Sequence, residues 1–303
     1  MGWILFLIVL IIFILFVLFV IKVNTFKFGI APNTIEIKPI RGLKKLSDIL
    51  DESLSKSFME NIEERVRNKH KLKENEYEWR LLDLKRYFIM TYILKESPMF
   101  SEKVDELWHE MLMFTREYDK FSGNYLGTKL HHSPNVNSEP EPDLRSFFDW
   151  VYAELFFIRK ENIHLYNGFF RNPVNPKIIE EFKNLSEDEL MPLYFKHDIK
   201  HTNTILALIT SMKKTVNLIK DHDKSTIRGR MRKAKSHQNY NAMLVPVLSV
   251  SYFHFDEFTS YLEINNYSSS NCTSCGSASY YNSCSSNSSC SSGSCSSCGG
   301  GGN

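Results

Sequence analysis

Three histidines lie near one another in the chain and could hold a metal ion. His109 follows Trp108 in an expected helix, and His131 and His132 follow the loop that ends this helix. Histidine is a common zinc ligand, because a neutral imidazole offers the ion a ring-nitrogen lone pair. Two interpretations are open. Either the three imidazoles converge on one metal or catalytic site, or His109 bonds a carboxylate such as Asp105 while the other two close the loop.

The six cysteines offer a second set of metal ligands, and all lie between Cys272 and Cys298. Cys272 and Cys275 form one C-x-x-C pair, Cys295 and Cys298 form another, and nineteen residues separate the two pairs. Two such pairs are typical of a four-thiolate zinc site. The alternative is a serine-rich tail with reduced thiols, because a segment so poor in apolar side chains does not fold unaided.

Nine basic residues and two acidic ones lie between residues 213 and 235, which gives this segment a net charge of +7. Each Lys or Arg near an anionic bilayer contributes about 1 kcal/mol of attraction. Nucleic acid is a less suitable partner, because few aromatic side chains lie among the charges to stack on bases. A solvated loop is the other interpretation. The residues expected at a membrane surface are Lys213, Lys214, Arg228, Arg230, Arg232, Lys233 and Lys235.

The sequence contains no complete catalytic motif. His109 and Glu110 begin the H-E-x-x-H pattern of zinc proteases, but Met113 occupies the position of the second histidine. The glycines form no phosphate-binding loop. The formal net charge of +2 gives the whole chain no general affinity for polyanions. We therefore expect an interaction protein rather than an enzyme, with zinc as the one possible cofactor.

Residues 2–21 read GWILFLIVLIIFILFVLFVI and carry no charge. A helix of this length extends about 30 Å, which matches the hydrocarbon core of a bilayer. The segment lacks the cleavage site of a signal peptide, so we expect a permanent single-pass anchor in the lipid bilayer. Four basic residues and one acidic residue lie between positions 22 and 41. The positive-inside rule then predicts that the body faces the cytoplasm.

The body that follows reads as mainly α. Apolar residues recur every three or four positions over 46–58, 79–94, 104–118 and about 201–219. Ser101 is a suitable N-cap for the third of these helices. Residues 33–40 are expected to be extended. The apolar run from Met243 to Phe255 contains Pro246, and we interpret it as a buried strand or packed segment.

These patterns predict a mainly α fold with an N-terminal transmembrane helix, an irregular helical bundle in two lobes and a disordered C-terminal tail. The tail, from Ser268 to Asn303, holds sixteen serines and six cysteines. The expected organisation is an anchor (1–23), a juxtamembrane linker (24–45), a first lobe (46–132), a proline-rich linker (133–143), a second lobe (144–260) that includes the basic segment, and the low-complexity tail (264–303).

The stretch around the three histidines resembles the glycine-rich domain-containing-protein-like family. The resemblance covers about residues 79–134, and the Cys/Ser/Gly-rich ending is similar to the tails of some members. It implies a helical domain with no established biochemical activity. The residues that carry it are Val104, Asp105, Trp108, His109, Thr115, Tyr118, His131, His132 and Pro134.

Two functions remain open at this point. The first is a single-pass, membrane-anchored helical module that serves as an interaction or scaffold domain at the cytoplasmic face. The second is a metal-binding protein or metal-dependent enzyme that uses His109, His131 and His132.

Overall fold

The computed structural model describes residues 26–132, 141–196 and 200–263, together with Trp3, Phe6, Leu10, Ile11 and Phe13. These residues form thirteen α-helices and two short 3-10 helices, and none of them belongs to a strand, which confirms the mainly α prediction. The α-helices are α2 (Leu43–Ser53), α3 (Lys56–Lys69), α4 (Glu76–Ile93), α5 (Glu102–Leu112), α6 (Thr115–Leu126), α7 (Pro142–Leu155), α8 (Lys160–Leu165), α9 (Pro176–Asn184), α10 (Glu187–Tyr194), α11 (Thr202–Val216), α12 (Lys224–Ser236), α13 (Leu244–Phe253) and α14 (Phe258–Leu262). The 3-10 helices are η1 (Tyr240–Met243) and η2 (Phe255–Glu257).

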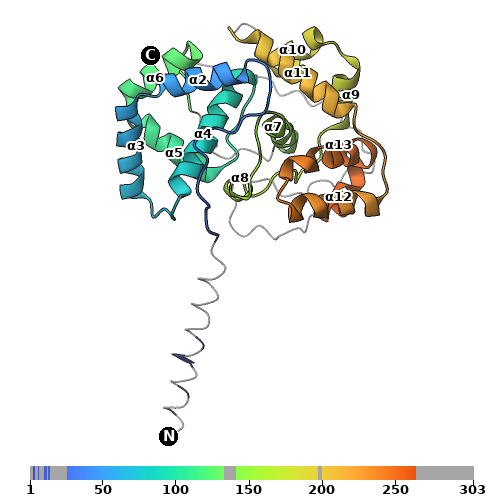
Figure 1. Ribbon diagram of the computed structural model, residues 1–303, viewed down its shortest axis with the longest axis horizontal. Coiled ribbons are helices and arrows are strands. Elements are labelled where there is room, and N and C mark those ends of the chain that lie inside the picture. Colours follow the sequence, from blue (N-terminus) through green and yellow to red (C-terminus); the bar gives the residue numbers. More distant parts are fainter. Residues whose placement is uncertain are drawn as a thin grey trace, which may run out of the picture.

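The helices fall into two groups, each around a central helix (Figure 1). Helices α2, α3, α5 and α6 surround α4, and the later helices surround α7. The buried apolar side chains of both groups join in one hydrophobic cluster. Both central helices are buried on nearly every side, so each must place its polar side chains against partners in the core.

A cluster of buried polar groups joins the two central helices. Arg86 of α4 has no exposed surface and donates hydrogen bonds to the carbonyl oxygen of Ile35 (2.8 Å) and to Tyr152 Oη of α7 (2.8 Å). Asp83, also fully buried, accepts hydrogen bonds from the Tyr152 hydroxyl and from the Asn162 amide of α8. This cluster, which we call the Arg86 cluster, ties the extended segment near Ile35 to helices from both groups.

Residues 33–40 are extended only in part, because Asn33 and Thr34 form a bend and Glu36 has a positive φ of 52°. Ile37 forms an isolated antiparallel bridge with Phe156, and the Lys38 N–H donates to the Leu155 carbonyl at 2.7 Å. The segment therefore lies along the end of α7.

Helix boundaries follow the capping residues. Ser101 Oγ accepts a hydrogen bond from the Val104 N–H (3.3 Å), as expected for the start of α5. The pattern over 46–58 is not one helix, because Ser55 caps α3 and separates it from α2. The pattern over 104–118 also divides, into α5 and α6, and Thr115 is exposed rather than inward-facing.

The prediction of a strand over Met243–Phe255 is wrong, although the segment is packed in the core. Residues Leu244–Phe253 form α13. Pro246 lies in the first turn, where a backbone N–H has no partner within the helix, so the ring is tolerated. The helix is apolar all round, so its sequence carries no 3.6-residue period that would distinguish it from a strand.

Most of the basic segment is helical and packed rather than a solvated loop. Lys213 and Lys214 lie in the last turn of α11, and Lys224–Ser236 form α12. Ile227, Met231 and Ala234 bury one face of α12, which leaves its basic side chains on the other faces.

Several predicted regions lie outside the described residues, namely 133–140 of the linker and the tail from residue 264. Of the predicted anchor, the five described residues are helical and their side chains are exposed. Within the described part of the chain, no helix is both long and apolar enough to cross a bilayer. Helix α7 begins with Pro142 and Asp143, which belong to the predicted linker.

Candidate functional site

Two of the three predicted histidines meet at one carboxylate. His132 Nε2 lies 2.8 Å from Asp105 Oδ1. His109 Nδ1 lies 2.8 Å from the Asp105 carbonyl oxygen and 3.4 Å from its Oδ2. Because a carbonyl oxygen only accepts, Nδ1 of His109 is the donor in this contact. We call Asp105, His109 and His132 the histidine group.

Aromatic residues of α5 and α6 position this group. The ring of Trp108 packs edge-to-face against His132, with ring centroids 4.5 Å apart. Trp108 Nε1–H donates to the Tyr118 hydroxyl, which donates to the carbonyl oxygen of Leu130, both at 3.0 Å. Burial raises the pKa of Tyr118 to about 12, so its hydroxyl remains a donor at neutral pH. The loop that carries His132 is therefore held in place by a chain of hydrogen bonds from α5.

The donor atoms of the histidine group are close enough to share a cation. One donor atom from each of the three residues lies within 4.8 Å of the other two. Ligand atoms of a tetrahedral zinc ion are about 3.3 Å apart, so binding would require the donor atoms that lie farther apart to approach one another. Three protein ligands leave a fourth position for water. His131 is exposed and does not belong to the group.

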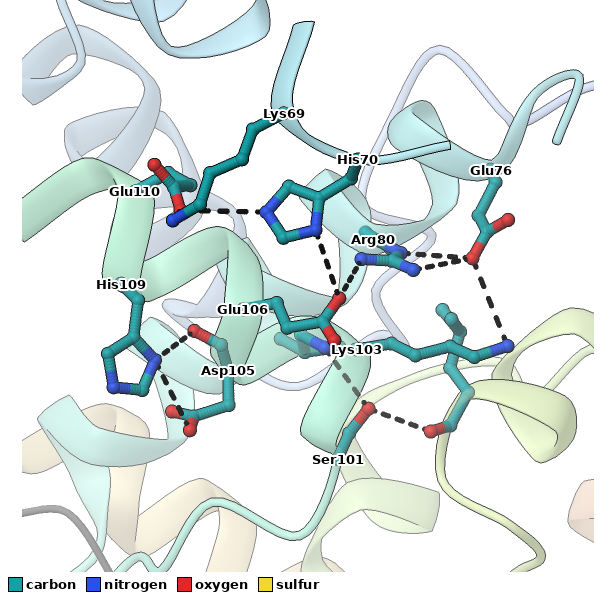
Figure 2. A network of polar contacts seen from close by, with 12 residues as sticks. Lys69, His70, Glu76, Arg80, Ser101, Lys103, Asp105, Glu106, His109 and Glu110 are labelled. Carbon is teal, nitrogen blue, oxygen red and sulfur yellow. Dashed lines mark hydrogen bonds and ion pairs between the residues drawn. The ribbon is translucent and has the colours of Figure 1, made fainter. Parts of the chain in front are cut away.

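A charged network lies on the other side of α5 (Figure 2). Arg80 of α4, which is nearly buried, contacts Glu76 and Glu106 at 2.7 Å each. His70 lies 3.8 Å from Glu106 and 3.5 Å from Glu110. The network joins α3, α4 and α5, and every carboxylate in it faces at least one basic side chain.

Glu110 shows how this network stabilises charge. Only 3% of its side chain is exposed, and it accepts hydrogen bonds from Arg65 at 2.6 Å and Lys69 at 2.5 Å. Burial alone raises the pKa of Glu110, but hydrogen bonds from Lys69, Arg65 and His70 outweigh burial and hold the pKa below its ordinary value. Glu110 is thus ionised and structural rather than available as a ligand.

A pocket of about 700 Å³ opens between α8, α12 and Phe26, the first residue of the continuous described stretch 26–132. Its volume lies in the range of small-molecule sites. Phe26 stacks on His164 of α8, with ring centroids 3.9 Å apart. Burial, followed by the charges of Lys103 and Lys73, lowers the pKa of His164 to about 4, so this wall is neutral at pH 7.

The pocket has an apolar floor and a basic rim. Lys160, Arg171 and Lys235 contribute the positive charges, and Glu263 is the acidic residue that lines it. The floor is formed by five buried apolar side chains, Phe169, Phe170, Met231, Met243 and Leu262.

The predicted cysteine ligands and the basic surface residues differ in whether the structure describes them and in what they contact. Cys272, Cys275, Cys295 and Cys298 lie outside the described residues, so zinc binding by the tail stays a prediction. Lys213 donates to the carbonyl oxygen of Leu185. Lys214 is exposed. Arg228 of α12 bonds the carbonyl oxygen of Ser260 at 2.8 Å. On α12, the side chains of Arg230, Arg232, Lys233 and Lys235 make no hydrogen bond or ion pair with other described residues.

Sequence patterns did not reveal the pocket. Its lining comes from positions near 26, 160–171, 231–243 and 262–263, and no local pattern indicates that such distant segments meet. The contact of His109 with Asp105, one helical turn before it, was predicted from the sequence, whereas the contact of His132 with the same carboxylate was not.

Comparison with known proteins gives one family match. A family model described as UCP032817-like matches residues 47–152, about one third of the chain, and this family is uncharacterised. No curated protein and no solved structure matches significantly. The matched residues include the whole stretch 79–134, although the glycine-rich family name stays a prediction. From within α2 to within α7, then, the chain is similar to an uncharacterised family.

Proposed function

We propose that this protein is a membrane-anchored helical interaction module, held in the bilayer by residues 2–21, with its body on the cytoplasmic side. The observation that carries the proposal is the run of twenty uncharged residues, of which the described members are helical with exposed apolar side chains. Trp3 is 85% exposed and Phe13 is 62% exposed. In water, such exposure forfeits about 25 cal/mol for each Å² of apolar surface, and a bilayer would remove that penalty.

The charge on the body supports an orientation against the anionic leaflet. The six basic residues of α12 are not opposed by any acidic residue within that helix. Figure 1 shows α8 and α12 along the same edge of the body at which the described chain begins, in dark blue. A chain that leaves the bilayer at this edge would bring α12 near the headgroups, where positive charge is stabilised.

Carbonate extraction of cell membranes tests the anchor. The full chain should remain with the membranes at alkaline pH, whereas the double variant Leu10→Lys/Phe13→Lys should be released, because each charge near the bilayer centre costs about 2.5–3.5 kcal/mol. A second double variant on the body, Lys44→Ala/Lys45→Ala, is the control and should remain bound. Release of the unaltered chain would contradict the proposal.

Metal binding by the histidine group is a second candidate function, favoured by the approach of Asp105, His109 and His132. Zinc suits this donor set, because imidazole nitrogen and carboxylate oxygen are both zinc ligands. A bound ion with one water position would supply Lewis-acid chemistry. Asp105 would then have to exchange its hydrogen bond from His132 for a bond to the metal.

Elemental analysis tests this site in a chain whose six tail cysteines are replaced by serine. We expect about one zinc ion per chain, by the ligand count of such a site. His132→Ala should abolish binding, and His131→Ala should retain it because His131 lies outside the group. Absence of zinc from the cysteine-free chain, or equal loss in both histidine variants, would exclude the site.

A further inference from the structure

The pocket beside Phe26 is lined by both apolar and basic side chains. Its floor is made of aromatic and thioether side chains, among them Phe169 and Met231. Its rim carries Lys160, Arg171 and Lys235. An apolar floor beneath a positive rim matches a ligand that has an apolar body and an anionic head.

The rim lysines are available to such a ligand. Lys235 is exposed, and its side chain has no partner among the described residues. Lys160 makes one long contact, 3.9 Å to Glu161, with half of its side chain exposed. Arg171 is anchored by a hydrogen bond to the carbonyl oxygen of Asn167 and keeps its other donors. In contrast, Glu263 is paired with Arg228 at 3.3 Å, which offsets its repulsion of an anion.

The position of the pocket in the chain limits its distance from the bilayer. Phe26 lies on the pocket wall, and only four residues lie between it and Ile21, the last residue of the apolar run. The five residue-to-residue steps from Ile21 to Phe26 span at most about 18 Å. If residues 2–21 cross the bilayer, the wall at Phe26 therefore lies within reach of the headgroup layer.

We propose that this pocket binds an anionic phospholipid from the bilayer that holds the anchor. The proposal rests on the proposed membrane anchoring. The phosphate-bearing head would lie between Lys160 and Lys235, and the upper part of an acyl chain would cover Met231 and Phe169. The basic α12 would contribute to general attraction, while the pocket would select one lipid molecule. The anchor and the pocket would together fix the orientation of the body on the membrane.

Photolabelling of the full chain in vesicles tests the pocket. The vesicles contain phosphatidylcholine with a small fraction of a probe lipid that carries a diazirine near the start of one acyl chain. One probe has a phosphatidylglycerol head and the other a phosphatidylcholine head. Labelled peptides are identified by mass spectrometry. We expect the anionic probe to label the segment with Met231 and Met243 at least about fivefold more than the zwitterionic probe, the factor that one basic contact supplies.

Matched charge reversals separate the pocket from general attraction. Lys160→Glu/Lys235→Glu should remove the preference for the anionic probe, and Arg232→Glu/Lys233→Glu should keep it. The two variants change the net charge equally, and the second pair is exposed on α12 outside the pocket lining. Circular dichroism before labelling confirms that each variant is folded.

The possible failures are distinguishable. Equal labelling by both probes, or equal loss in both charge-reversal variants, would overturn the pocket and leave only diffuse surface attraction. If the chain floats with the vesicles but is not labelled at the pocket, the lipid site is overturned and the anchor remains supported. A chain that does not float with the vesicles would overturn both proposals.

Discussion

The Arg86 cluster and the pocket beside Phe26 are both built from basic and aromatic side chains. They differ in the burial and in the hydrogen-bond partners of those side chains. Arg86 is fully buried, and each of its nitrogen atoms donates to a carbonyl or hydroxyl oxygen. Lys235 at the pocket is exposed and has no partner among the described residues. The rings near Arg86 are sealed in the core, whereas those of the pocket floor border an open cavity.

This difference distinguishes side chains that stabilise the fold from side chains that are available to bind a ligand. A buried charge whose hydrogen bonds are all made contributes to the fold, and removing one partner leaves the others uncompensated. An exposed charge without partners contributes little to stability and is free to bind a ligand. The histidine group lies between these limits, because it is partly buried and its hydrogen bonds could be exchanged for metal bonds.

The largest change in the free energy of unfolding is expected for a substitution in the Arg86 cluster. Arg86→Ala should lower the free energy of unfolding by about 3–5 kcal/mol, because Asp83 would lose its buried cation. Urea unfolding of the detergent-solubilised chain measures this change. Arg232→Ala, an exposed control, should stay within about 0.5 kcal/mol of the original. Equal stability of the two variants would refute the structural role of the cluster.

A smaller change in the free energy of unfolding is expected for a substitution of Glu110. The size of this change should depend on pH. Glu110→Gln should cost about 1.5–3 kcal/mol at pH 7, the range for hydrogen bonds to charged groups. The folded-state pKa of Glu110 lies below the ordinary 4.5. Its carboxylate therefore stabilises the fold above that pH, and this contribution is lost as the pH falls through the lowered pKa.

Unfolding experiments at a series of pH values check this sign. The stability difference between the original chain and Glu110→Gln should shrink as the medium is acidified below 4.5. A difference that is independent of pH would mean that the charge of Glu110 is not what stabilises the network.

A substitution in the histidine group should lower stability by less than the Glu110 variant and by more than a substitution at the pocket rim. His132→Ala removes a hydrogen bond to Asp105 and the ring contact with Trp108, so we expect a loss of about 1 kcal/mol in metal-free buffer. His131→Ala should leave stability unchanged. Thermal unfolding with a chelator present compares them, and a larger loss in His131→Ala would contradict the arrangement of the loop.

The smallest effect on stability is expected at the pocket rim. Lys160→Ala/Lys235→Ala should change the free energy of unfolding by less than about 0.5 kcal/mol in lipid-free detergent, because these side chains make few contacts. The same variant should lose the preference for anionic lipid. A marked loss of stability would show that the rim belongs to the fold rather than to a binding site.

Local sequence signals predicted much of the fold. The period of 3.6 residues identified α4 and α11, and Ser101 identified the start of α5. The signals failed where burial removes the period, as in α13, and where one pattern hides a break, as at Ser55. The first failure follows from the burial of α13 on most of its sides, and the second from an N-cap residue within a continuous apolar pattern.

The candidate sites were less predictable than the helices. His109, its partner Asp105 and His132 were identified from the sequence, but the contact between His132 and Asp105 depends on how the loop after α6 folds back on Trp108. His131 is adjacent to His132 in sequence and still falls outside the group. The pocket required contact between Phe26, α8 and α12, which is a property of the tertiary structure alone.

Amine footprinting of the full chain in vesicles tests the central claim, that the edge bearing α12 and the pocket faces the bilayer. Lys233 and Lys235 should react more slowly with an amine reagent in anionic vesicles than in detergent. Helix α2 lies at the opposite edge of the body (Figure 1), and its exposed Lys45 should react equally in both media. Equal reactivity of all three lysines in both media would contradict the account.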